Sequence, residues 1–161
     1  MEYPSTEDGA SVTDLAQVFS DLVRYETRLY NALGARLRAE HGLTTSQFEF
    51  LRMIGGRDDC RVNDLAQEFA IAVGATSKGV DRLETAGWVS RRPNPENRRS
   101  SLLALTESGR RLLEAATPTF EGELRIRLAD PLTARSLDQL AAAVARLRAT
   151  VEEAGVGQPS G

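Results

Sequence analysis

Apolar residues recur at spacings of three and four over residues 11–40, which predicts one long amphipathic helix. Its stripe consists of Leu15, Val18, Leu22, Tyr25, Leu29, Leu33 and Leu37. His41-Gly42 is expected to end this helix, because glycine readily adopts the left-handed conformation found there. A second stripe with the same spacing lies near the other end of the chain and predicts a short seam like that of a coiled coil. It consists of Leu137, Leu140, Val144, Leu147 and Val151.

Between the two stripes the pattern predicts shorter helices. Thr44 and Gln47 have the spacing of a capping box and should begin a second helix, whose apolar face is Phe48, Leu51 and Ile54. Asn63 is expected to cap a third helix, which buries Leu65, Ala66 and Phe69. Residues 60–62 are expected to form a short strand before it. A fourth helix is expected over about 73–86, where it buries Val80 and Leu83 and stops at Gly87.

A charged hairpin follows the fourth helix. The segments 88–90 and 101–105 flank a turn rich in proline and asparagine, as the two arms of a hairpin do. Thr106 should cap a fifth helix that ends before Asp130-Pro131. Two short helices followed by a charged hairpin are typical of a winged helix-turn-helix, which places one helix in a DNA groove.

The predicted fold class is therefore mainly α with a small β-hairpin wing, a winged helix-turn-helix domain between N- and C-terminal dimerisation helices. The expected divisions are a flexible tail at 1–10, dimerisation helices at 11–40 and 107–154, the winged helix-turn-helix DNA-binding domain at 43–106, and a flexible tail at 155–161.

Composition and charge narrow the function. The 161 residues suffice for one domain, and the chain as a whole carries a net charge of −3. The stretch from Lys78 to Arg99 carries +3, which is the segregation expected when one face meets phosphate. A single cysteine excludes an intramolecular disulfide, and no signal peptide or membrane-spanning run is visible. We therefore expect a cytoplasmic protein without membrane contact.

Catalytic, metal and cofactor sites find no support in the sequence. No Ser/His/Asp constellation, glycine-rich phosphate loop or acid/base pair stands out, so we expect no enzyme and no cofactor. His41 and Cys60 lack the partners that a zinc site needs. A lone cysteine before a short helix is usually inert, although a redox role for Cys60 stays open.

Candidate DNA contacts lie on the fourth helix and on the hairpin. Hydroxyl and amine groups in the first turns of a recognition helix suit base or phosphate contacts, and arginines on a projecting hairpin suit phosphate or the minor groove. Arg91 and Arg92 alternate along a strand, so only one of them can face DNA, and Arg91 is also a candidate for bracing the wing. The predicted DNA-binding set is Thr76, Ser77, Lys78, Arg82, Arg91, Arg98 and Arg99.

The chain resembles the MarR family of transcriptional regulators. The resemblance rests on the joint order of Asn63-Asp64-Leu65-Ala66, of Asp81-Arg82-Leu83-Glu84 within 76–87, of Arg91, Asn94-Pro95 and Arg99, and of Leu105-Thr106-Glu107-Ser108-Gly109. It implies a homodimer with intertwined terminal helices, the fourth helix in the major groove of double-stranded DNA, and Arg99 in the minor groove.

Two residues depart from the family pattern. Asn97 stands where the family usually has an aspartate. The asparagine keeps a hydrogen-bond acceptor at this position but lacks the negative charge that would brace the wing. Ala72 stands where the recognition helix usually has a Ser or Thr cap. Peroxide-sensing relatives carry their cysteine in the first helix, and this chain has none there.

The resemblance also implies a small aromatic or phenolic effector, held between the dimer helices and the winged domain. An arginine in such a crevice would pair with a carboxylate. The candidate lining residues are Arg24, Tyr25, Arg28, Gln47 and Met53, each of which has packing or surface exposure as its alternative.

The leading hypothesis is thus a dimeric, sequence-specific DNA-binding transcriptional regulator, a ligand-relieved repressor of a pseudo-palindromic operator. The alternative is a winged-helix protein-interaction module that regulates another factor without binding DNA. Asn97 and the acidic total charge favour this alternative.

Overall fold

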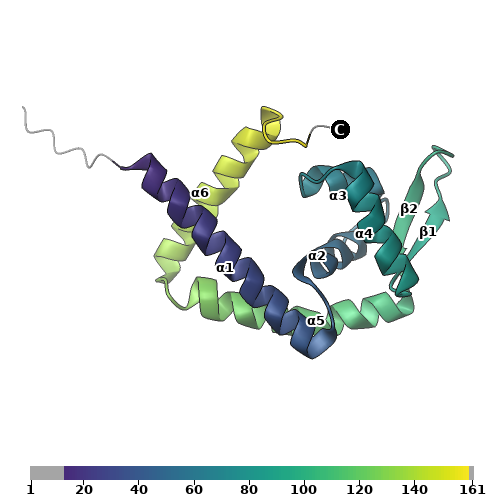
Figure 1. Ribbon diagram of the computed structural model, residues 1–161, viewed down its shortest axis with the longest axis horizontal. Coiled ribbons are helices and arrows are strands. Elements are labelled where there is room, and N and C mark those ends of the chain that lie inside the picture. Colours follow the sequence, from purple (N-terminus) through teal and green to yellow (C-terminus); the bar gives the residue numbers. More distant parts are fainter. Residues whose placement is uncertain (1–12, 160–161) are drawn as a thin grey trace, which may run out of the picture.

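The computed structural model describes residues 13–159 and is mainly helical, with one two-stranded antiparallel hairpin (Figure 1). This confirms the predicted fold class of a mainly α protein with a small wing. The elements are α1 (Leu15–His41), α2 (Thr45–Gly55), α3 (Val62–Glu68), α4 (Val73–Thr85), β1 (Val89–Pro93), β2 (Ser101–Leu105), α5 (Glu107–Leu124), the π-helix η1 (Arg125–Ala129) and α6 (Ala134–Glu153).

The predicted tails fall partly outside the described residues. The tail at 1–10 lies there entirely, as do residues 11–12 of the first predicted helix and residues 160–161 of the second tail. Residues 154–157 form a turn that follows α6.

The long elements divide the molecule into two ends. In Figure 1 the helices α2, α3 and α4 and the hairpin lie at one end, and the first halves of α1 and α6 lie at the other. The second half of α6 runs back toward α3, where Arg148 pairs with Glu68 at 3.2 Å. The helix α5 runs between the two ends, and the second half of α1 packs against it. The hairpin and α4 are therefore held away from the free surfaces of α1 and α6.

Local signals set several helix ends, and those at Gly42 and Thr44 were predicted from the sequence. The Asp14 carboxylate accepts hydrogen bonds from the amides of Ala16 (3.0 Å) and Gln17 (3.2 Å), which satisfies free donors at the start of α1. Gly42 ends α1 with a φ of 70°, in the left-handed region that favours glycine. The capping box of α2 is present, since the Gln47 amide donates to Thr44 Oγ1 and Gln47 Oε1 accepts from the Thr44 amide.

The start of α3 differs from the prediction. The predicted cap, Asn63, already lies inside the helix, and the N-cap is Arg61. The Arg61 amide donates to Asp64 Oδ2 at 2.8 Å, so the Asp64 carboxylate reaches back to serve the end of the helix. The predicted strand at 60–62 is also wrong, because Val62 is helical and the Cys60 carbonyl accepts one isolated bond from the Leu103 amide (2.7 Å).

The hydrophobic core lies in the winged end of the molecule. It is centred on α2, where the Phe48 ring stacks on the Phe120 ring of α5 with centroids 4.4 Å apart. Fully buried side chains from several elements complete it: Leu37, Leu43, Leu51, Ile54, Leu65, Val80, Leu83, Val89 and Leu103. In contrast, no residue of α6 is buried.

The start of α5 is fastened to the corner between α4 and β1. The Thr106 hydroxyl donates to the Gly87 carbonyl at 2.6 Å, and the Thr106 amide donates to the Trp88 carbonyl at 3.0 Å. Gly109 rests on the same carbonyl, and a Cβ at this position would lie 2.0 Å from the Trp88 oxygen. The segment Leu105–Gly109 therefore joins the hairpin root to α5, and no room for a further side-chain atom is left between Gly109 and Trp88.

Candidate nucleic-acid interface

One face of α4 packs into the core and the other is open. Thr76, Val80 and Leu83 are buried, and Gly79 lies so near Phe50 that a Cβ would be 3.0 Å from its ring. Lys78 and Arg82 project from the opposite face. Within residues 13–159 neither of these two cations forms an ion pair, so both charges are available to an anionic partner.

The first turn of α4 corrects the predicted contact set. Thr76 is only 1% exposed, and its hydroxyl donates to the Ala72 carbonyl at 3.1 Å. The side chain points inward because it packs on the core face together with Val80, so it offers no group to a base. Ser77 is half-buried beside it. Ala72 makes no side-chain cap bond, in line with the departure noted in the sequence.

The hairpin pairs in a regular antiparallel register. Val89 lies opposite Leu105 and Arg91 lies opposite Leu103. Leu103 and Val89 are buried, whereas Arg92 is exposed on the other side of β1. The hairpin is thus anchored at its root by apolar side chains and carries its charge toward the tip.

Asparagine side chains hold the turn at the tip. Asn94 is 7% exposed, and its amide group donates to Ser100 Oγ at 2.8 Å while its oxygen accepts from the Glu96 amide at 3.0 Å. Asn97 Oδ1 accepts from the Arg99 amide at 3.0 Å. The hydrogen-bond acceptor that Asn97 retains in place of the aspartate is therefore in use, and it fixes the backbone at Arg99.

The side chains of Arg98 and Arg99 extend from this ordered turn into solvent. Both residues are exposed, and neither forms an ion pair with any of the described residues. Two unpaired guanidinium groups on a fixed turn form a concentrated positive charge, which is the feature that phosphate or a narrow minor groove attracts.

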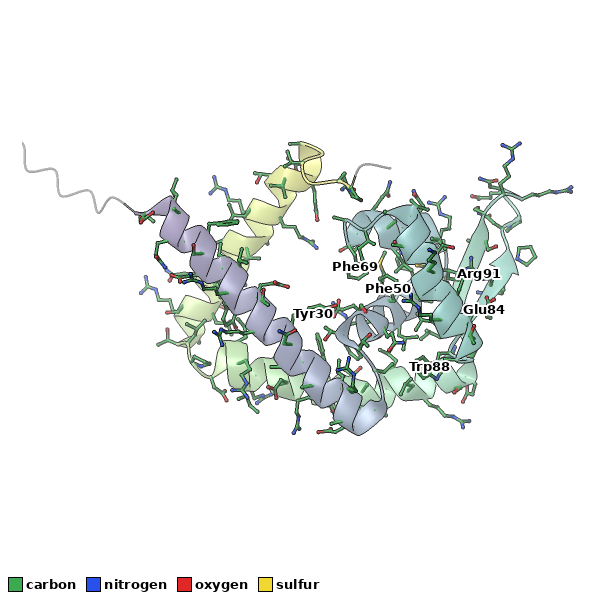
Figure 2. All side chains as sticks on the ribbon, viewed as in Figure 1. Tyr30, Phe50, Phe69, Glu84, Trp88 and Arg91 are labelled. Carbon is green, nitrogen blue, oxygen red and sulfur yellow. The ribbon has the colours of Figure 1, made fainter. Side chains whose placement is uncertain are left out.

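Arg91 has a different environment from the tip arginines. Its Nη2 lies 2.5 Å from Asp81 Oδ1, and its Nε lies 3.4 Å from Glu84 Oε2, so it bridges β1 to two carboxylates of α4. Figure 2 shows Arg91 and Glu84 together at the junction of wing and helix. The side chain is 28% exposed and its charge is paired, which matches the bracing role rather than a free phosphate contact.

Ionisable groups near α3 have shifted pKa values. The side-chain hydrogen bond from Arg61 lowers the pKa of Asp64 below its usual range, and the same bond raises the pKa of Arg61. Burial raises the pKa of the Cys60 thiol to about 11, with a further contribution from the charge of Asp64. The thiol is fully buried and protonated at neutral pH, which is the state of an inert cysteine.

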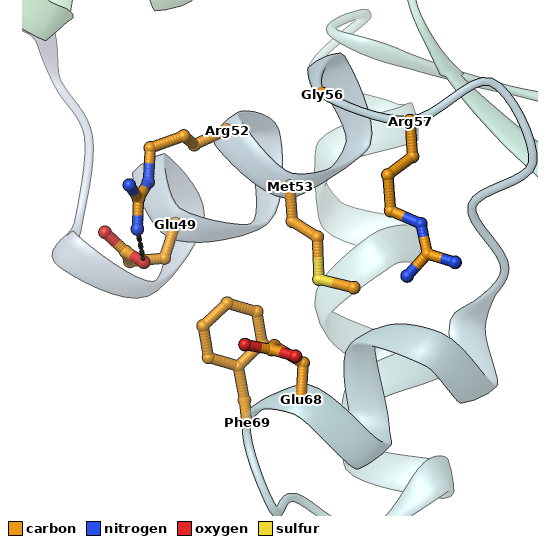
Figure 3. A pocket seen from close by; sticks show the side chains of 7 residues that line it. All are labelled: Glu49, Arg52, Met53, Gly56, Arg57, Glu68 and Phe69. Carbon is orange, nitrogen blue, oxygen red and sulfur yellow. Dashed lines mark hydrogen bonds and ion pairs between the residues drawn. The ribbon is translucent and has the colours of Figure 1, made fainter. Parts of the chain in front are cut away.

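A separate hollow of about 350 Å³ lies between α2 and α3 (Figure 3). Met53 and Phe69 form its apolar part, and two arginines stand at its sides. Arg52 is paired with Glu49 at 2.9 Å, and Arg57 approaches Asp59 at 3.5 Å. The full lining is Glu49, Arg52, Met53, Gly56, Arg57, Glu68 and Phe69.

The structure does not bring the five predicted effector residues together in this hollow. Met53 lines it, whereas Gln47 Oε1 is used in the cap of α2. The Tyr25 hydroxyl donates to the Arg127 carbonyl at 3.1 Å, which joins α1 to η1. Arg24 and Arg28 are exposed on α1. Arg52 of α2 and Arg57 of the loop after it line this hollow, and no sequence pattern singled them out.

The chain from residue 13 to residue 159 holds neither a metal-ligand cluster nor a membrane-spanning helix. No group of three or more His, Cys, Asp or Glu side chains in this range is placed to hold a metal ion. No helix in the same range is long and apolar enough to cross a bilayer.

The geometry is that of a winged helix-turn-helix protein, and comparisons with known proteins identify its family. Residues 43–101 match the model of the MarR family. The chain is 30% identical over 116 residues to an uncharacterized HTH-type transcriptional regulator, YdgJ of Bacillus subtilis, with 72% of this chain and 70% of that protein covered. It is 32% identical over 92 residues to the multiple antibiotic resistance protein MarR of Escherichia coli, with 57% of this chain and 64% of that protein covered.

Solved structures share this fold. A MarR family transcriptional regulator from Streptomyces coelicolor, in complex with DNA, superposes with a TM-score of 0.79 at 24% identity, over 90% of this chain and 88% of that one. A mutant of Escherichia coli MarR complexed with operator DNA superposes with a TM-score of 0.72 at 26% identity, over 84% and 99%.

The chain belongs to the MarR family of transcriptional regulators. The expectation that it is not an enzyme is confirmed by the class of these relatives.

Proposed function

We propose that this chain is a homodimeric repressor that binds a pseudo-palindromic operator in double-stranded DNA and releases it when a small effector binds. The proposal rests on the cations of α4 and of the wing tip, which form no ion pair with any described residue. Lys78, Arg82, Arg98 and Arg99 are exposed together on the reading head, defined here as α3, α4 and the β1–β2 hairpin. Relatives of the same fold have been solved on DNA.

Each part of the reading head has a separate role in this proposal. The helix α4 enters the major groove, where Lys78 and Arg82 contact phosphate or base edges and Ser77 lies at the margin. Arg98 and Arg99 enter the minor groove or neutralise its phosphates. Arg91 positions the wing on α4 through Asp81, and Thr76 supports α4 from inside.

Exposed apolar side chains support the homodimer. Leu15 is 77% exposed, Phe19 67% and Leu147 61%, on helices that bury little or nothing within one chain. Groups of exposed apolar side chains of this kind commonly mark protein–protein interaction sites. A second copy packed on α1 and α6 would cover it and would set two reading heads about one helical turn of DNA apart.

The hollow between α2 and α3 supports effector relief. It combines an apolar floor of Met53 and Phe69 with two arginines and two glutamates, a combination suited to a small aromatic compound with polar groups. Because α2 and α3 form the base on which α4 rests, a ligand there would favour one placement of the reading head over another. The proposed class of effector is a small aromatic or phenolic compound.

Salt-dependent DNA binding tests the main proposal. The purified protein is mixed with a fluorescent duplex from the region beside its own gene, and affinity is measured by anisotropy over a range of salt concentrations. We expect log affinity to fall with log salt with a slope of about −0.9 per phosphate neutralised. No sequence-selective binding at low salt would contradict the proposal and favour the protein-interaction module.

A matched pair of variants tests the dimer. Leu147→Glu places a charge on α6, and Val156→Glu places the same charge on a side chain that is also 61% exposed but lies beyond the helix. Analytical ultracentrifugation should show a dimer for the wild type and Val156→Glu, and a monomer for Leu147→Glu. A wild-type monomer at micromolar concentration would contradict the dimer.

A ligand panel tests the effector. Benzoate and phenol derivatives are screened for release of the fluorescent operator, and any active compound is repeated on Phe69→Ala and Tyr25→Ala. We expect Phe69→Ala alone to weaken the response, because the Phe69 ring lines the hollow and Tyr25 does not. A response that depends on Tyr25 would place the effector on α1, and no response across the panel would remove effector relief.

A further inference from the structure

Lys78 lies at the centre of the open face of α4. At 3.6 residues per turn, it stands about 170° around the helix from the mean direction of the buried Thr76, Val80 and Leu83. Its side chain is exposed and forms no ion pair with any described residue. It is also the only lysine of the chain. The ammonium group of Lys78 therefore projects directly away from the protein core.

This central position decides which part of a major groove the side chain would meet. An α-helix with its side chains is about 10–12 Å across and nearly fills a groove about 12 Å wide. The side turned away from the protein then faces the base edges on the floor, and the flanks face the phosphates of the walls. Asp81 lies about 60° from Lys78 on the flank of the wing, and Arg82 about 40° on the other flank. Lys78 is thus the cation best placed for a base edge.

The residues one turn before Lys78 leave room for close approach. Gly74 and Ala75 are exposed on the same face, and a methyl group added at Gly74 would meet no atom within 4 Å. No contact within the protein therefore requires a glycine there, whereas a bare backbone lets α4 sink further into a groove. Thr85 shares this face but is the last residue of α4, and recognition helices read bases with their N-terminal part.

The chemistry of the ammonium group selects among the bases. It has N–H donors and no acceptor. In the major groove guanine offers two neighbouring acceptors, O6 and N7, whereas cytosine offers a donor. Adenine places a donor beside its N7 acceptor, and thymine places a methyl group beside its O4 acceptor. Guanine is therefore the best complement to a side chain that can only donate.

We propose that Lys78 reads a guanine in each operator half-site by donating hydrogen bonds to its O6 and N7 atoms. This inference rests on the proposed DNA-binding function and makes Lys78 a specificity-determining residue of it. Arg82, on the flank of α4, then adds affinity through a phosphate, a contact that carries no sequence information.

Base analogues isolate this contact. Duplexes are selected from a random pool by the wild-type protein, and each guanine of the selected site is replaced singly by 7-deazaguanine, in which a C–H group takes the place of N7. Inosine is the control, because it keeps O6 and N7 and lacks only the amino group in the minor groove. We expect one guanine per half-site at which 7-deazaguanine weakens binding by about fivefold, the equivalent of about 1 kcal/mol, and inosine weakens it less.

A matched pair of variants connects that guanine to the helix. Lys78→Met keeps a long side chain without donors, and Arg82→Met removes the same charge from the same helix. In Lys78→Met the penalty for 7-deazaguanine should shrink toward onefold. In Arg82→Met affinity should fall for every sequence and the penalty should remain. Because both side chains are exposed, thermal melting of both variants should match that of the wild type.

The single lysine allows a measurement that needs no variant. Isotope-labelled lysine gives one side-chain ammonium signal in nuclear magnetic resonance spectra, which belongs to Lys78. This signal should differ between the complexes with the guanine duplex and with the 7-deazaguanine duplex. An identical signal in the two complexes would contradict the contact with N7.

The binding experiments separate failure of this readout from failure of the proposed function. Specific binding without a guanine that is sensitive to 7-deazaguanine would overturn the guanine readout and leave the DNA-binding function intact. A sensitive guanine that stays equally sensitive in Lys78→Met would also overturn it, since another residue would then contact N7. Failure to select any sequence would instead contradict the proposed function itself.

Discussion

The two kinds of arginine on the wing should respond differently to salt. Arg91 is paired with Asp81 and Glu84, whereas Arg99 is exposed and unpaired among the described residues. Replacing Arg99 with Gln should weaken operator binding by about 1–3 kcal/mol. It should also reduce the steepness of the salt dependence by about 0.9 for each phosphate that the variant no longer neutralises.

The matched perturbation at Arg91 preserves the local charge. In the double variant Arg91→Gln with Asp81→Asn, one cation and one anion are removed together, so the net charge of the reading head is unchanged. The slope of log affinity against log salt should therefore equal that of the wild type, even though affinity falls through loss of the brace. Fluorescence anisotropy over a series of salt concentrations measures both quantities.

Stability gives an independent magnitude for the same interaction. Asp81 and Glu84 are 60% and 46% exposed, so solvent screening limits the brace to about 0.5–1 kcal/mol. For a chain of this length, thermal unfolding should shift by about 2–4 °C per kcal/mol at fixed protein concentration. The single variants Arg91→Gln and Asp81→Asn should each show this loss, and the double variant should show less than their sum.

The bracing role of Arg91 would be refuted if the salt dependence of the double variant became as shallow as that of Arg99→Gln. Arg91 would then contact a phosphate in the complex, and its pairing with α4 would be a feature of the free protein only. Additive stability effects of the two single changes would also contradict the brace.

Other predictions concern the support of the reading head. Gly109→Ala should destabilise the protein by about 1–3 kcal/mol or prevent its folding, since the new methyl would meet the Trp88 carbonyl; urea unfolding with Gly74→Ala as control measures this. Cys60 should not react with a thiol reagent at neutral pH until denaturant is added, because its pKa is raised to about 11; rapid labelling of the native protein would contradict its burial. Asp64→Asn should cost about 1 kcal/mol at neutral pH. This difference in the free energy of unfolding should vanish as the pH falls through the lowered pKa of Asp64, because the wild-type carboxylate then takes up a proton and loses its ionic bond to Arg61. An equal difference between wild type and variant in acid would contradict the role of the Asp64 charge.

Sequence patterning predicted the elements well because most of them follow strong local rules. The stripe from Leu15 to Leu37, the capping box at Thr44 and the left-handed Gly42 each depend on neighbours within one or two helical turns. Such signals are legible without knowledge of the fold. The order of short helices and hairpin was enough to predict the winged helix-turn-helix.

The errors arose where residues beyond the local pattern decide the outcome. Asn63 has the chemistry of a cap, yet the competing interaction between Arg61 and Asp64 starts α3 earlier. Thr76 reads as a polar surface residue, and only the packing of α4 on α2 shows that it faces inward. In both cases a property of one side chain was overridden by its surroundings.

The candidate site was predictable in part for the same reason. The exposed arginines of the wing tip follow from a charged turn between two strands, and Asn97 kept the acceptor expected of it. The partner of Arg91 lies ten positions earlier on another element, so the sequence left both a DNA contact and a brace open. The hollow beside Met53 depends on how α2 meets α3, which no local pattern encodes.

The close fit of Gly109 on Trp88 determines how motion can pass through this molecule. Because not even a methyl group fits between the first turn of α5 and the hairpin root, we expect these two segments to move as one rigid body. Bending is then expected further along α5, where Pro118 removes one backbone hydrogen bond and the π-helix η1 follows the last turn. In the proposed dimer, the distance between the two reading heads would therefore be set at the far end of α5, remote from the surface that would touch DNA.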